Sequence, residues 1–346
     1  MSRTAVIGSG TWGSALAILL SHNGHEVTVW SAFQEEIDSF LATRKHVNLP
    51  GAVFPDSIMF TSDLEKAMAD KEILVLAVPS VFTRGTAAKM APFYKEGQII
   101  VSVAKGIEEK TLKIQTEQIE EEIPGSIVTC LSGPSHAEEV SRGIPTTCVA
   151  GARARVYAEK VQKTFSSPVF RVYVSPDLLG IELGASIKNV IALAAGIADG
   201  LGCGDNTKAA LITRGIAEIT RLGVEMGASP ETFAGLSGIG DLIVTCASMH
   251  SRNRRAGILI GKGYTAQQAM DEVKQVVEGV YSAKVALALS KTYGVSMPLV
   301  EEVNRILFEN KTPEEALNDL MSRGFKAESR QLNWPGERRE PLFGQG

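Results

Sequence analysis

The chain has 346 residues, of which 44% are hydrophobic and 21% are charged, and its formal net charge is −4. This length predicts two domains, and the hydrophobic content is that of a globular protein with ample material for a core. The negative balance argues against general nucleic-acid binding, which usually requires an excess of basic residues.

Short apolar runs alternate with helical patterns along the first half of the chain. Strands are expected at residues 4–7, 26–30, 73–78, 99–103, 127–131, 146–150 and 169–174, and helices at 15–23, 34–42, 64–69, 83–92 and 112–122. Alternation of nearly all-apolar strands with helices predicts a mainly parallel sheet that is covered on both faces. The fold class is therefore an α/β Rossmann-type domain in this half.

The pattern becomes almost wholly helical after residue 177. Helices are expected at residues 178–199, 206–226, 230–234, 251–261, 265–271, 280–293, 298–308 and 313–321. These patterns predict a dinucleotide-binding domain at 1–177 and an all-α substrate domain at 178–328. Residues 329–346 carry little periodicity and are expected to form a poorly ordered tail.

The sequence also bears on the compartment. No signal-peptide pattern precedes the first strand, and the longest apolar runs, at 15–20 and 190–197, fall short of the roughly 20 residues that a membrane span requires. The four cysteines form no Cys-x-x-Cys pair, which argues against disulfides and zinc and for a reducing cytoplasm.

The segment Gly8-Ser9-Gly10-Thr11-Trp12-Gly13 has the spacing of a dinucleotide-binding loop. It follows a strand and opens a helix, which is the context that the motif requires. Gly8 would permit the tight turn, Gly10 the approach of the pyrophosphate, and Gly13 close packing of helix on strand. The alternative is a glycine-rich turn without a ligand.

The choice between NAD and NADP depends on the end of the second strand. An acid there would bind the ribose 2′-hydroxyl, and an arginine would accept a 2′-phosphate. The chain has Ser31-Ala32-Phe33, which is neither, while Glu35 and Glu36 come a few residues later and are expected to begin the next helix. The preference stays open.

Two polar groups follow later strands of the predicted sheet. Lys105 comes at the end of an apolar strand and would point into the ligand crevice, or it is a solvated loop residue. After the next strand, Gly133 would allow close backbone approach, and Ser135 offers a hydroxyl and an N–H group. His136 could be a general base, but a lone histidine after a Pro-Ser turn is more often a loop or helix-start residue.

Lys188 lies in the middle of a long apolar helix. At helical spacing it shares a face with Gly184, Ala192 and Ala195, so a ligand is expected to approach the helix closely there. A desolvated lysine has a lowered pKa, which suits proton transfer near neutral pH. Alternatively, the ammonium reaches the surface with its stem along apolar neighbours.

Further along the chain, Asp241 follows a glycine-rich turn and could hold the Lys188 ammonium, or it could cap a helix. The run Ser251-Arg252-Asn253-Arg254-Arg255 combines guanidinium and amide donors that suit a phosphate. The alternative for this run is a solvated basic face.

Taken together, these motifs resemble the bacterial-type soluble NAD(P)-dependent glycerol-3-phosphate dehydrogenases. The resemblance runs from Thr4 to Glu328 and rests on GSGTWGSALA, SVAKGIE, LSGPSHAEE, GIELGASIKNVIALAAGIADGLGCGDN, GLSGIGDLIVTC, SRNRRAG and VVEG. Two positions depart from the family: Ala32 stands where a basic residue is frequent, and His136 where phenylalanine is frequent. The first leaves NADP preference in doubt, and the second argues against a general role for the histidine.

The resemblance implies a role for each matching residue. Lys188 would accept the proton during glycerol 3-phosphate oxidation, with Asp241 and Lys105 as further catalytic groups. The cofactor would contact Gly8, Gly10, Thr11, Trp12, Gly13, Lys105, Ala137, Arg252, Val276 and Glu278. The substrate would contact Lys105, Gly133, Ser135, Lys188, Asn189, Asp241, Thr245, Ser251, Arg252 and Asn253.

The expected reaction is reversible hydride transfer between NAD(P)H and dihydroxyacetone phosphate, with no metal, in a cytoplasmic homodimer that supplies glycerol 3-phosphate for glycerophospholipid synthesis. Two alternatives remain at this stage. One is another two-domain dehydrogenase acting on a hydroxy acid or an opine-like substrate, and the other is a non-catalytic dinucleotide-binding redox sensor.

Overall fold

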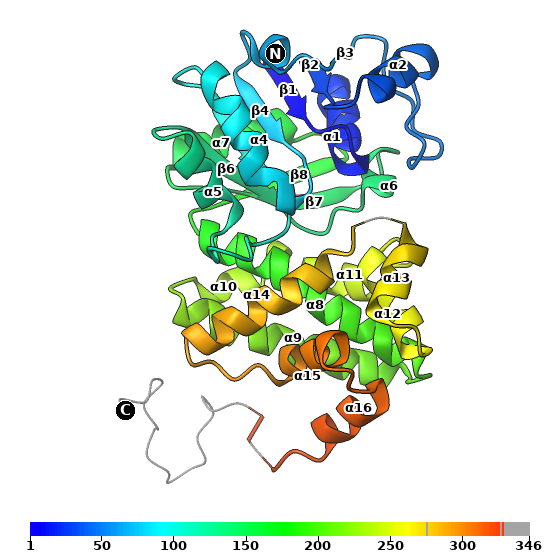
Figure 1. The fold of residues 1–346 in the computed structure, drawn as a ribbon. Helices are drawn as coiled ribbons and strands as arrows, with labels where there is room; N and C mark the ends of the chain where they lie inside the picture. Colours follow the sequence, from blue (N-terminus) through cyan, green and yellow to red (C-terminus); the bar gives the residue numbers. More distant parts are fainter. Residues whose placement is uncertain (275, 326, 329–346) are drawn as a thin grey trace.

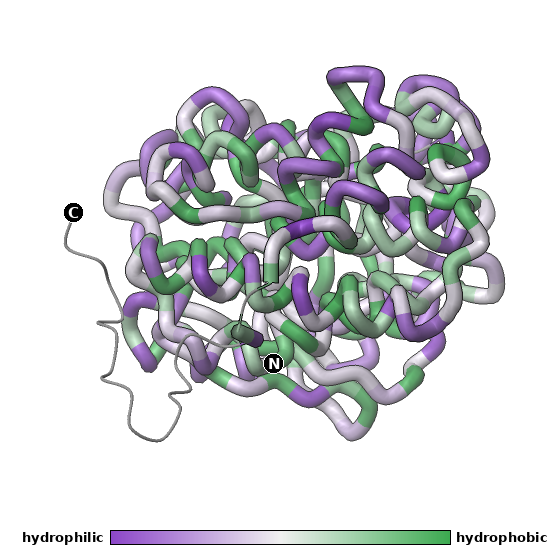
Figure 2. The backbone as a smooth tube through the Cα atoms, turned by 90° about the horizontal axis from the view of Figure 1, so that it is seen from below, coloured by the Kyte–Doolittle hydropathy of each residue, from purple (hydrophilic) through white to green (hydrophobic). Residues whose placement is uncertain are grey.

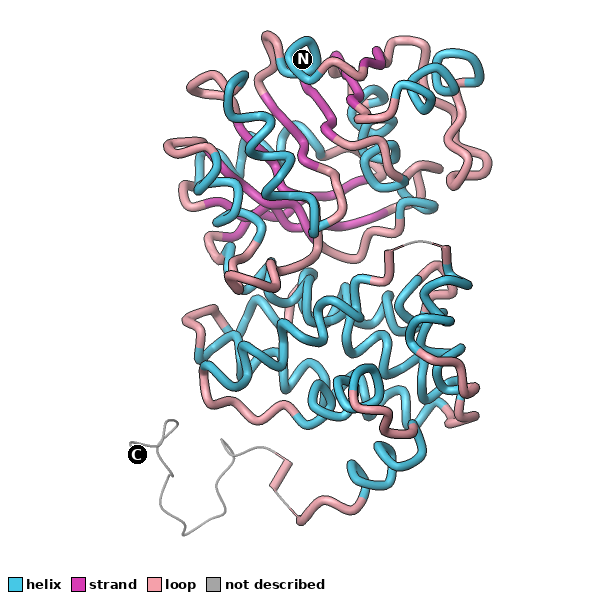
Figure 3. Tube along the Cα trace, viewed as in Figure 1, coloured by secondary structure: helices cyan, strands magenta, loops and turns pink. Residues whose placement is uncertain are grey.

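The computed structural model describes residues 1–274, 276–325 and 327–328. The expected tail at 329–346 lies outside these residues. An α/β part occupies the upper half of Figure 1 and a helical part the lower half, and Figure 3 shows that the strands are confined to the upper half. The expected boundary at residue 177 falls between the last strand, which ends at Ser175, and the long helix that begins at Leu178.

The α/β part is built on one sheet of eight strands in the order β3-β2-β1-β4-β5-β6-β7-β8. All neighbouring strands are parallel except β6 and β7, so the expectation of a mainly parallel sheet is confirmed. The strands are β1 (Arg3–Ile7), β2 (Glu26–Trp30), β3 (Met59–Thr61), β4 (Ile73–Leu76), β5 (Ile99–Ser102), β6 (Ile127–Ser132), β7 (Thr146–Ala152) and β8 (Phe170–Ser175).

Helices cover both faces of this sheet. They are α1 (Thr11–His22), α2 (Gln34–Thr43), α3 (Leu64–Met68), α4 (Thr83–Met90), α5 (Gln115–Glu122), α6 (Ala137–Val140) and α7 (Arg155–Phe165), with short 3₁₀ turns at Ser80–Phe82 and Ala91–Phe93. Alternate residues of a strand point to opposite faces, so Val6 packs in one apolar core while Ala5 and Ile7 pack in the other. The elements β3, α6 and α7 were not predicted from the sequence.

The helical part contains α8 (Leu178–Gly200), α9 (Asp205–Glu225), α10 (Pro230–Phe233), a π-helical turn at Leu236–Gly240, α11 (Asp241–Ala247), α12 (Arg252–Gly261), α13 (Ala266–Val273), α14 (Glu278–Thr292), α15 (Pro298–Phe308) and α16 (Pro313–Met321). The helix α8 runs through the middle and contacts α9, α11, α12 and α14. Figure 2, seen from below, shows hydrophilic and hydrophobic residues interleaved along the chain. The helix α11 was not predicted from the sequence.

The helix α8 is as long as a membrane span, although it is not an uninterrupted apolar run because it contains Glu182 and Lys188. In the described part of the chain, α8 has 23 residues and is apolar enough to span a bilayer, but 94% of its most apolar window is buried inside the protein. Its apolarity therefore serves the core that the surrounding helices form with it.

Glycines let α8 and α12 cross in direct backbone contact. A Cβ on Gly257 would lie 2.2 Å from the carbonyl oxygen of Leu193, and one on Gly196 would lie 2.2 Å from that of Arg254. No real side chain tolerates such distances, so the crossing depends on glycine at these positions. As a result, the beginning of α12 is held firmly against the helix that carries Lys188.

Candidate active site

A cleft of about 790 Å³ lies between the two parts, a size typical of small-molecule sites. Its α/β wall comes from the residues that follow β1, β2, β4, β5 and β6, and its helical wall comes from α8, α11, α12 and the chain around the start of α14. Ligands of open α/β sheets bind beyond the carboxyl ends of the strands, and this cleft occupies that position.

The glycine loop after β1 fits the pyrophosphate of a dinucleotide. Gly8 has a φ of 115°, and a Cβ on it would lie 2.8 Å from the Ala77 carbonyl, whereas a Cβ on Gly10 would meet nothing within 4 Å. No side chain in the described part of the chain caps α1, so the N–H groups of its first turn are available to an anion. Trp12 adds a buried indole N–H that has no partner among the described residues.

A carboxylate between two ammonium groups forms the centre of the cleft. Lys188 Nζ lies 3.0 Å from Asp241 Oδ1 and donates a 2.7 Å hydrogen bond to Thr245 Oγ1. Lys105 Nζ donates to Asp241 Oδ2 at 2.7 Å and to the Gly133 carbonyl at 3.0 Å. Thr245 in turn donates to the Asp241 carbonyl. The aspartate therefore joins a lysine of the α/β part to a lysine of the helical part.

Burial sets the acid–base properties of this group. The Lys188 side chain is 5% exposed, and this desolvation lowers its pKa to about 8 against the opposing attraction of Asp241. Burial alone would raise the pKa of Asp241, but Lys105 and Lys188 outweigh it and hold that pKa below its usual value. The centre therefore contains an ionised carboxylate and an amine that can gain or lose a proton near neutral pH.

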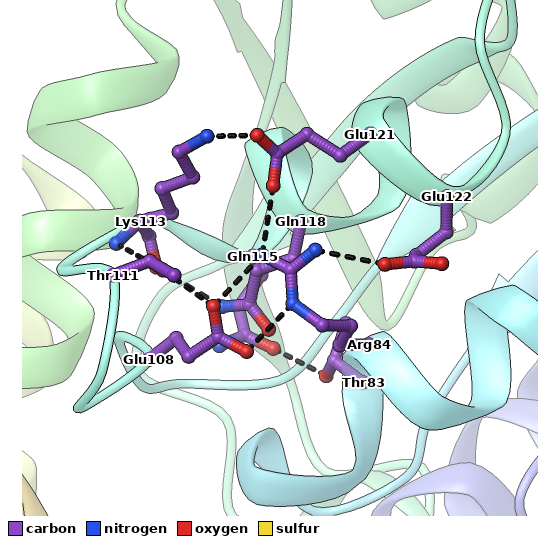
Figure 4. Close-up of polar contacts among 9 residues, drawn as sticks. All are labelled: Thr83, Arg84, Glu108, Thr111, Lys113, Gln115, Gln118, Glu121 and Glu122. Atoms are coloured by element: carbon purple, nitrogen blue, oxygen red, sulfur yellow. Dashed lines mark hydrogen bonds and ion pairs between the residues drawn. The ribbon is translucent and has the colours of Figure 1, made fainter.

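A network of polar contacts fixes the loop that carries Lys105 (Figure 4). Gln115, fully buried at the start of α5, donates to the Gly106 carbonyl at 2.8 Å. It also accepts a hydrogen bond from Thr83, which Figure 4 shows. Arg84 holds both carboxylate oxygens of Glu108 at 2.7 and 2.8 Å, and this contact lowers the pKa of Glu108. The same guanidinium contacts Glu121 and Glu122, so α4 and α5 together clamp the loop.

The N-terminus of α12 supplies cationic groups at the helical wall. Ser251 caps the helix by accepting from the Arg254 N–H at 3.2 Å. Arg252 and Arg255 line the cleft, and the buried Nε of Arg255 has no partner among the described residues. Arg254 instead binds Asp199 at 2.7 Å, outside the cleft lining. A helix N-terminus with two arginines suits an anionic phosphate group.

Asn253 connects three elements of this wall. Its Nδ2 donates to Asn189 Oδ1 on α8 at 2.9 Å, and its Oδ1 accepts from the Gly279 N–H at the start of α14 at 2.8 Å. Beside this link, Val276 and Glu278 line the cleft, and Ser80 donates to Glu278 at 3.4 Å. Burial raises the pKa of Glu278, although Arg252 opposes the shift. The segment before α14 is therefore tied to both walls.

Comparison with known proteins identifies the family. A model described as the N-terminus of NAD-dependent glycerol-3-phosphate dehydrogenase matches residues 3–158, and the model of its C-terminus matches residues 177–318. The chain belongs to this dehydrogenase family. It is an oxidoreductase that uses NAD(P) and acts on the CH–OH group of glycerol 3-phosphate.

Relatives match over nearly the full length of this dehydrogenase. A glycerol-3-phosphate dehydrogenase [NAD(P)+] of Agathobacter rectalis is 62% identical, covering 96% of this chain and 100% of the relative. The corresponding protein of Fusobacterium nucleatum is 56% identical, covering 95% and 99%. The crystal structure of glycerol-3-phosphate dehydrogenase from Coxiella burnetii has a TM-score of 0.90 at 34% identity, covering 93% and 99%. These matches favour the main expectation over both alternative functions.

Most of the expected site residues of the dehydrogenase meet in the cleft. Fifteen of them line it: Gly10, Thr11, Trp12, Lys105, Ser135, Ala137, Lys188, Asn189, Asp241, Thr245, Ser251, Arg252, Asn253, Val276 and Glu278. Gly8, Gly13 and Gly133 are not part of the lining, but each lies where a Cβ would collide with neighbouring backbone, so they shape the loops. The individual roles of all these residues stay predictions.

One expectation about the site and one alternative interpretation are wrong. The small-residue face of α8 is not open to a ligand, because a Cβ on Gly184 would lie 2.9 Å from the Ser237 carbonyl and Ala192 and Ala195 are fully buried. Asp241 is not a helix cap, because Gly240 holds that position and the Asp241 carboxylate faces the two lysines.

His136 lies in the cleft lining without a determined role. Its ring is 5.8 Å from that of His250, and its buried Nε2 has no partner within the described residues. Burial lowers its pKa, with Lys188 and Lys105 acting in the same direction. The imidazole is therefore neutral near pH 7.

One part of the cleft wall and the position of Arg255 in the lining were not predicted from the sequence. Residues from Glu35 to Asn48, in α2 and the loop after it, line the cleft beside the glycine loop. Nothing in their spacing indicates a site, because they are brought there by the turn of the chain after β2. Arg255, in contrast, lies three residues after Arg252, and helical spacing could have placed both on one face.

Proposed function

We propose that this cleft catalyses reversible reduction of dihydroxyacetone phosphate to glycerol 3-phosphate, with Lys188 as the proton-transfer group. The observation that carries the proposal is the buried Lys188 ammonium, which opens onto the cleft and is held by Asp241 and Thr245. When bound, the nicotinamide would supply or accept the hydride. The glycine loop and the Trp12 indole would hold the dinucleotide against the α/β wall.

In reduction, Lys188 would donate a proton to the carbonyl oxygen as it gains negative charge, and in oxidation the neutral amine would take the proton from the hydroxyl. A pKa of about 8 makes both protonation states accessible near neutral pH. Asp241 would keep the amine directed into the cleft. Lys105, on the other carboxylate oxygen, would present a second positive charge toward the substrate oxygens.

The substrate phosphate would lie at the N-terminus of α12. Arg252 and Arg255 would provide charged donors there, and Asn253 would fix the relative positions of α8, α12 and α14. Binding the phosphate at a fixed distance from Lys188 would orient the carbonyl carbon toward the nicotinamide. No group of three or more His, Cys, Asp or Glu side chains that could hold a metal occurs among the described residues.

The test measures oxidation of NADH and NADPH with dihydroxyacetone phosphate and, in parallel, with unphosphorylated dihydroxyacetone. Turnover restricted to the phosphorylated ketone is expected. Lys188→Met should reduce kcat by roughly 10²- to 10⁴-fold while cofactor binding persists, because proton transfer contributes about that factor. Equal turnover of both ketones would refute the phosphate site, and full activity of the variant would refute the role of Lys188.

We further propose that the enzyme is a cytoplasmic homodimer in which residues 1–177 and 178–328 form separate domains and which supplies glycerol 3-phosphate for glycerophospholipid synthesis. The free state of all four cysteines supports a reducing compartment. The exposed side chains of Tyr173 and Val174 on the edge strand β8 offer apolar surface to a partner copy. Light scattering after gel filtration would test the dimer, and a monomeric mass would refute it.

A further inference from the structure

The carboxylate of Glu36 lies between the glycine loop and the end of β2. The residue stands in the first turn of α2, and both the Ser9 and the Ser31 hydroxyls donate to its Oε2 at 2.6 Å. Ser9 belongs to the glycine loop, and Ser31 directly follows β2. Both serines are buried, and the Gly8 N–H donates to the Trp30 carbonyl at 3.0 Å, so loop and strand end are joined at this point.

In dinucleotide-binding folds, an acid at the end of the second strand accepts hydrogen bonds from the ribose hydroxyls, and its charge opposes a 2′-phosphate. The residues at that end here, Ser31 and Ala32, carry no charge. Glu36 comes five residues later in the chain, but the turn into α2 brings its carboxylate back to the same place. Its Oε1 has no hydrogen bond within the described residues, and the side chain lines the cleft.

We propose that Glu36 makes this dehydrogenase select NAD(H) over NADP(H). The two serine hydroxyls fix one carboxylate oxygen, which leaves the other to accept from the ribose 2′-hydroxyl. A phosphate at that position would bring its negative charge against the carboxylate. Glu35 also lines the cleft, but the two serines hold Glu36 and not Glu35, so the charge of Glu35 is expected to act on this position only weakly.

The cations near this wall do not offset the two glutamates. The Arg44 guanidinium donates to the Ile58 carbonyl at 2.8 Å and lies over the Phe60 ring. His46 is buried, which lowers its pKa, so it carries no charge near pH 7. Lys45 is exposed and lines the cleft, so among the described cations of this wall it is the candidate for contact with a 2′-phosphate.

The experiment titrates NADH and NADPH separately into the protein without substrate and follows nucleotide fluorescence, so the result does not depend on turnover. Repulsion between two like charges about 4 Å apart weakens binding roughly fivefold in bulk water and about a thousandfold at an effective dielectric constant of 20. The wild-type protein is therefore expected to bind NADH tighter than NADPH by roughly 100-fold. Glu36→Gln should reduce this ratio at least tenfold by raising NADPH affinity.

Glu35→Gln is the matched control, because it removes the same charge from the neighbouring residue without removing the acceptor that Ser9 and Ser31 hold. It is expected to change the ratio by less than roughly threefold. A damaged fold in Glu36→Gln would weaken the binding of both nucleotides. A gain in NADPH affinity would therefore show that Glu36 acts on cofactor specificity. If the wild-type protein bound NADPH as tightly as NADH or more tightly, the proposal would be overturned. If Lys45→Ala then weakened NADPH binding, the 2′-phosphate contact would be assigned to Lys45 instead.

Discussion

Replacing Asp241 by asparagine should shift the proton-transfer step to lower pH. The substitution keeps the shape of the side chain but removes the negative charge between the ammonium groups of Lys105 and Lys188, which lie 2.7 and 3.0 Å from its two oxygens. A charge pair 3 Å apart at an effective dielectric constant of about 20 interacts by roughly 5 kcal/mol. Each pKa unit corresponds to about 1.4 kcal/mol.

The amide oxygen of asparagine still accepts one hydrogen bond, so only part of this interaction is lost. We expect the pKa of Lys188 to fall by roughly two units from its value of about 8 in the unsubstituted enzyme. Oxidation of glycerol 3-phosphate needs the neutral amine, so its rate should begin to rise at lower pH in the variant. Reduction needs the protonated amine and should lose roughly tenfold near pH 7, since only about a tenth of the amine would stay protonated.

The assay is the pH dependence of kcat/KM in both directions, combined with NADH binding. Asp199→Asn is the control, because Asp199 also holds two cations, Lys208 at 2.8 Å and Arg254 at 2.7 Å, outside the cleft lining. Both variants should lower the free energy of unfolding, by about 3–5 kcal/mol where a buried charge is left without its partner. Only Asp241→Asn should shift the pH at which kcat/KM rises or falls. A folded Asp241→Asn enzyme with an unchanged pH dependence of kcat/KM would refute the proposed effect of Asp241 on the pKa of Lys188.

Three further predictions concern packing, buried charge and the Lys105 loop. Gly257→Ala should lower the free energy of unfolding by roughly 1–3 kcal/mol, because its Cβ would meet the Leu193 carbonyl, whereas Gly85→Ala, with nothing within 4 Å, should be neutral or slightly stabilising in a denaturant titration. Burial raises the pKa of Glu182 to about 8, so this carboxyl binds its proton more tightly in the folded protein than in the unfolded chain. The stability that the protonated carboxyl contributes is therefore lost as the pH rises from about 4.5 to 8. Glu182→Gln should therefore gain on the order of 4 kcal/mol over the unsubstituted enzyme between those limits, and parallel pH–stability curves would contradict this. Gln115→Ala should release the Gly106 carbonyl and lower kcat/KM roughly tenfold with little change in NADH binding, and unchanged kinetics would show that the loop holds Lys105 without this contact.

The parts of the fold that could be predicted are those whose signals are local. β1, the glycine loop and the start of α1 follow from about fifteen consecutive residues, and the apolar length of α8 marks a central helix. β3 has only three residues, too few for a period-two pattern to stand out. The antiparallel pairing of β6 with β7 is not encoded in either strand alone, because both are apolar runs that suit either direction.

The site shows the same division. Lys188 was identified because a charged residue stands within an apolar helix, and the Asp241 contact with it was expected. The Lys105–Asp241 contact was not expected, because 136 positions separate the two residues and only the approach of the two parts brings them together. Glu36 was passed over for a similar reason, since the distance along the chain from β2 does not show where the first turn of α2 directs a side chain.

The backbone contact between α8 and α12 makes the enzyme modular in a practical sense. The proposed proton donor and the proposed phosphate-binding arginines belong to two helices that cannot slide past one another, so their spacing is determined entirely by residues after 177. The residues proposed to select the cofactor, Ser9, Ser31 and Glu36, all precede residue 44. An engineer could therefore exchange one nicotinamide cofactor for the other by editing the first 44 residues, while the geometry that recognises the substrate is inherited unchanged.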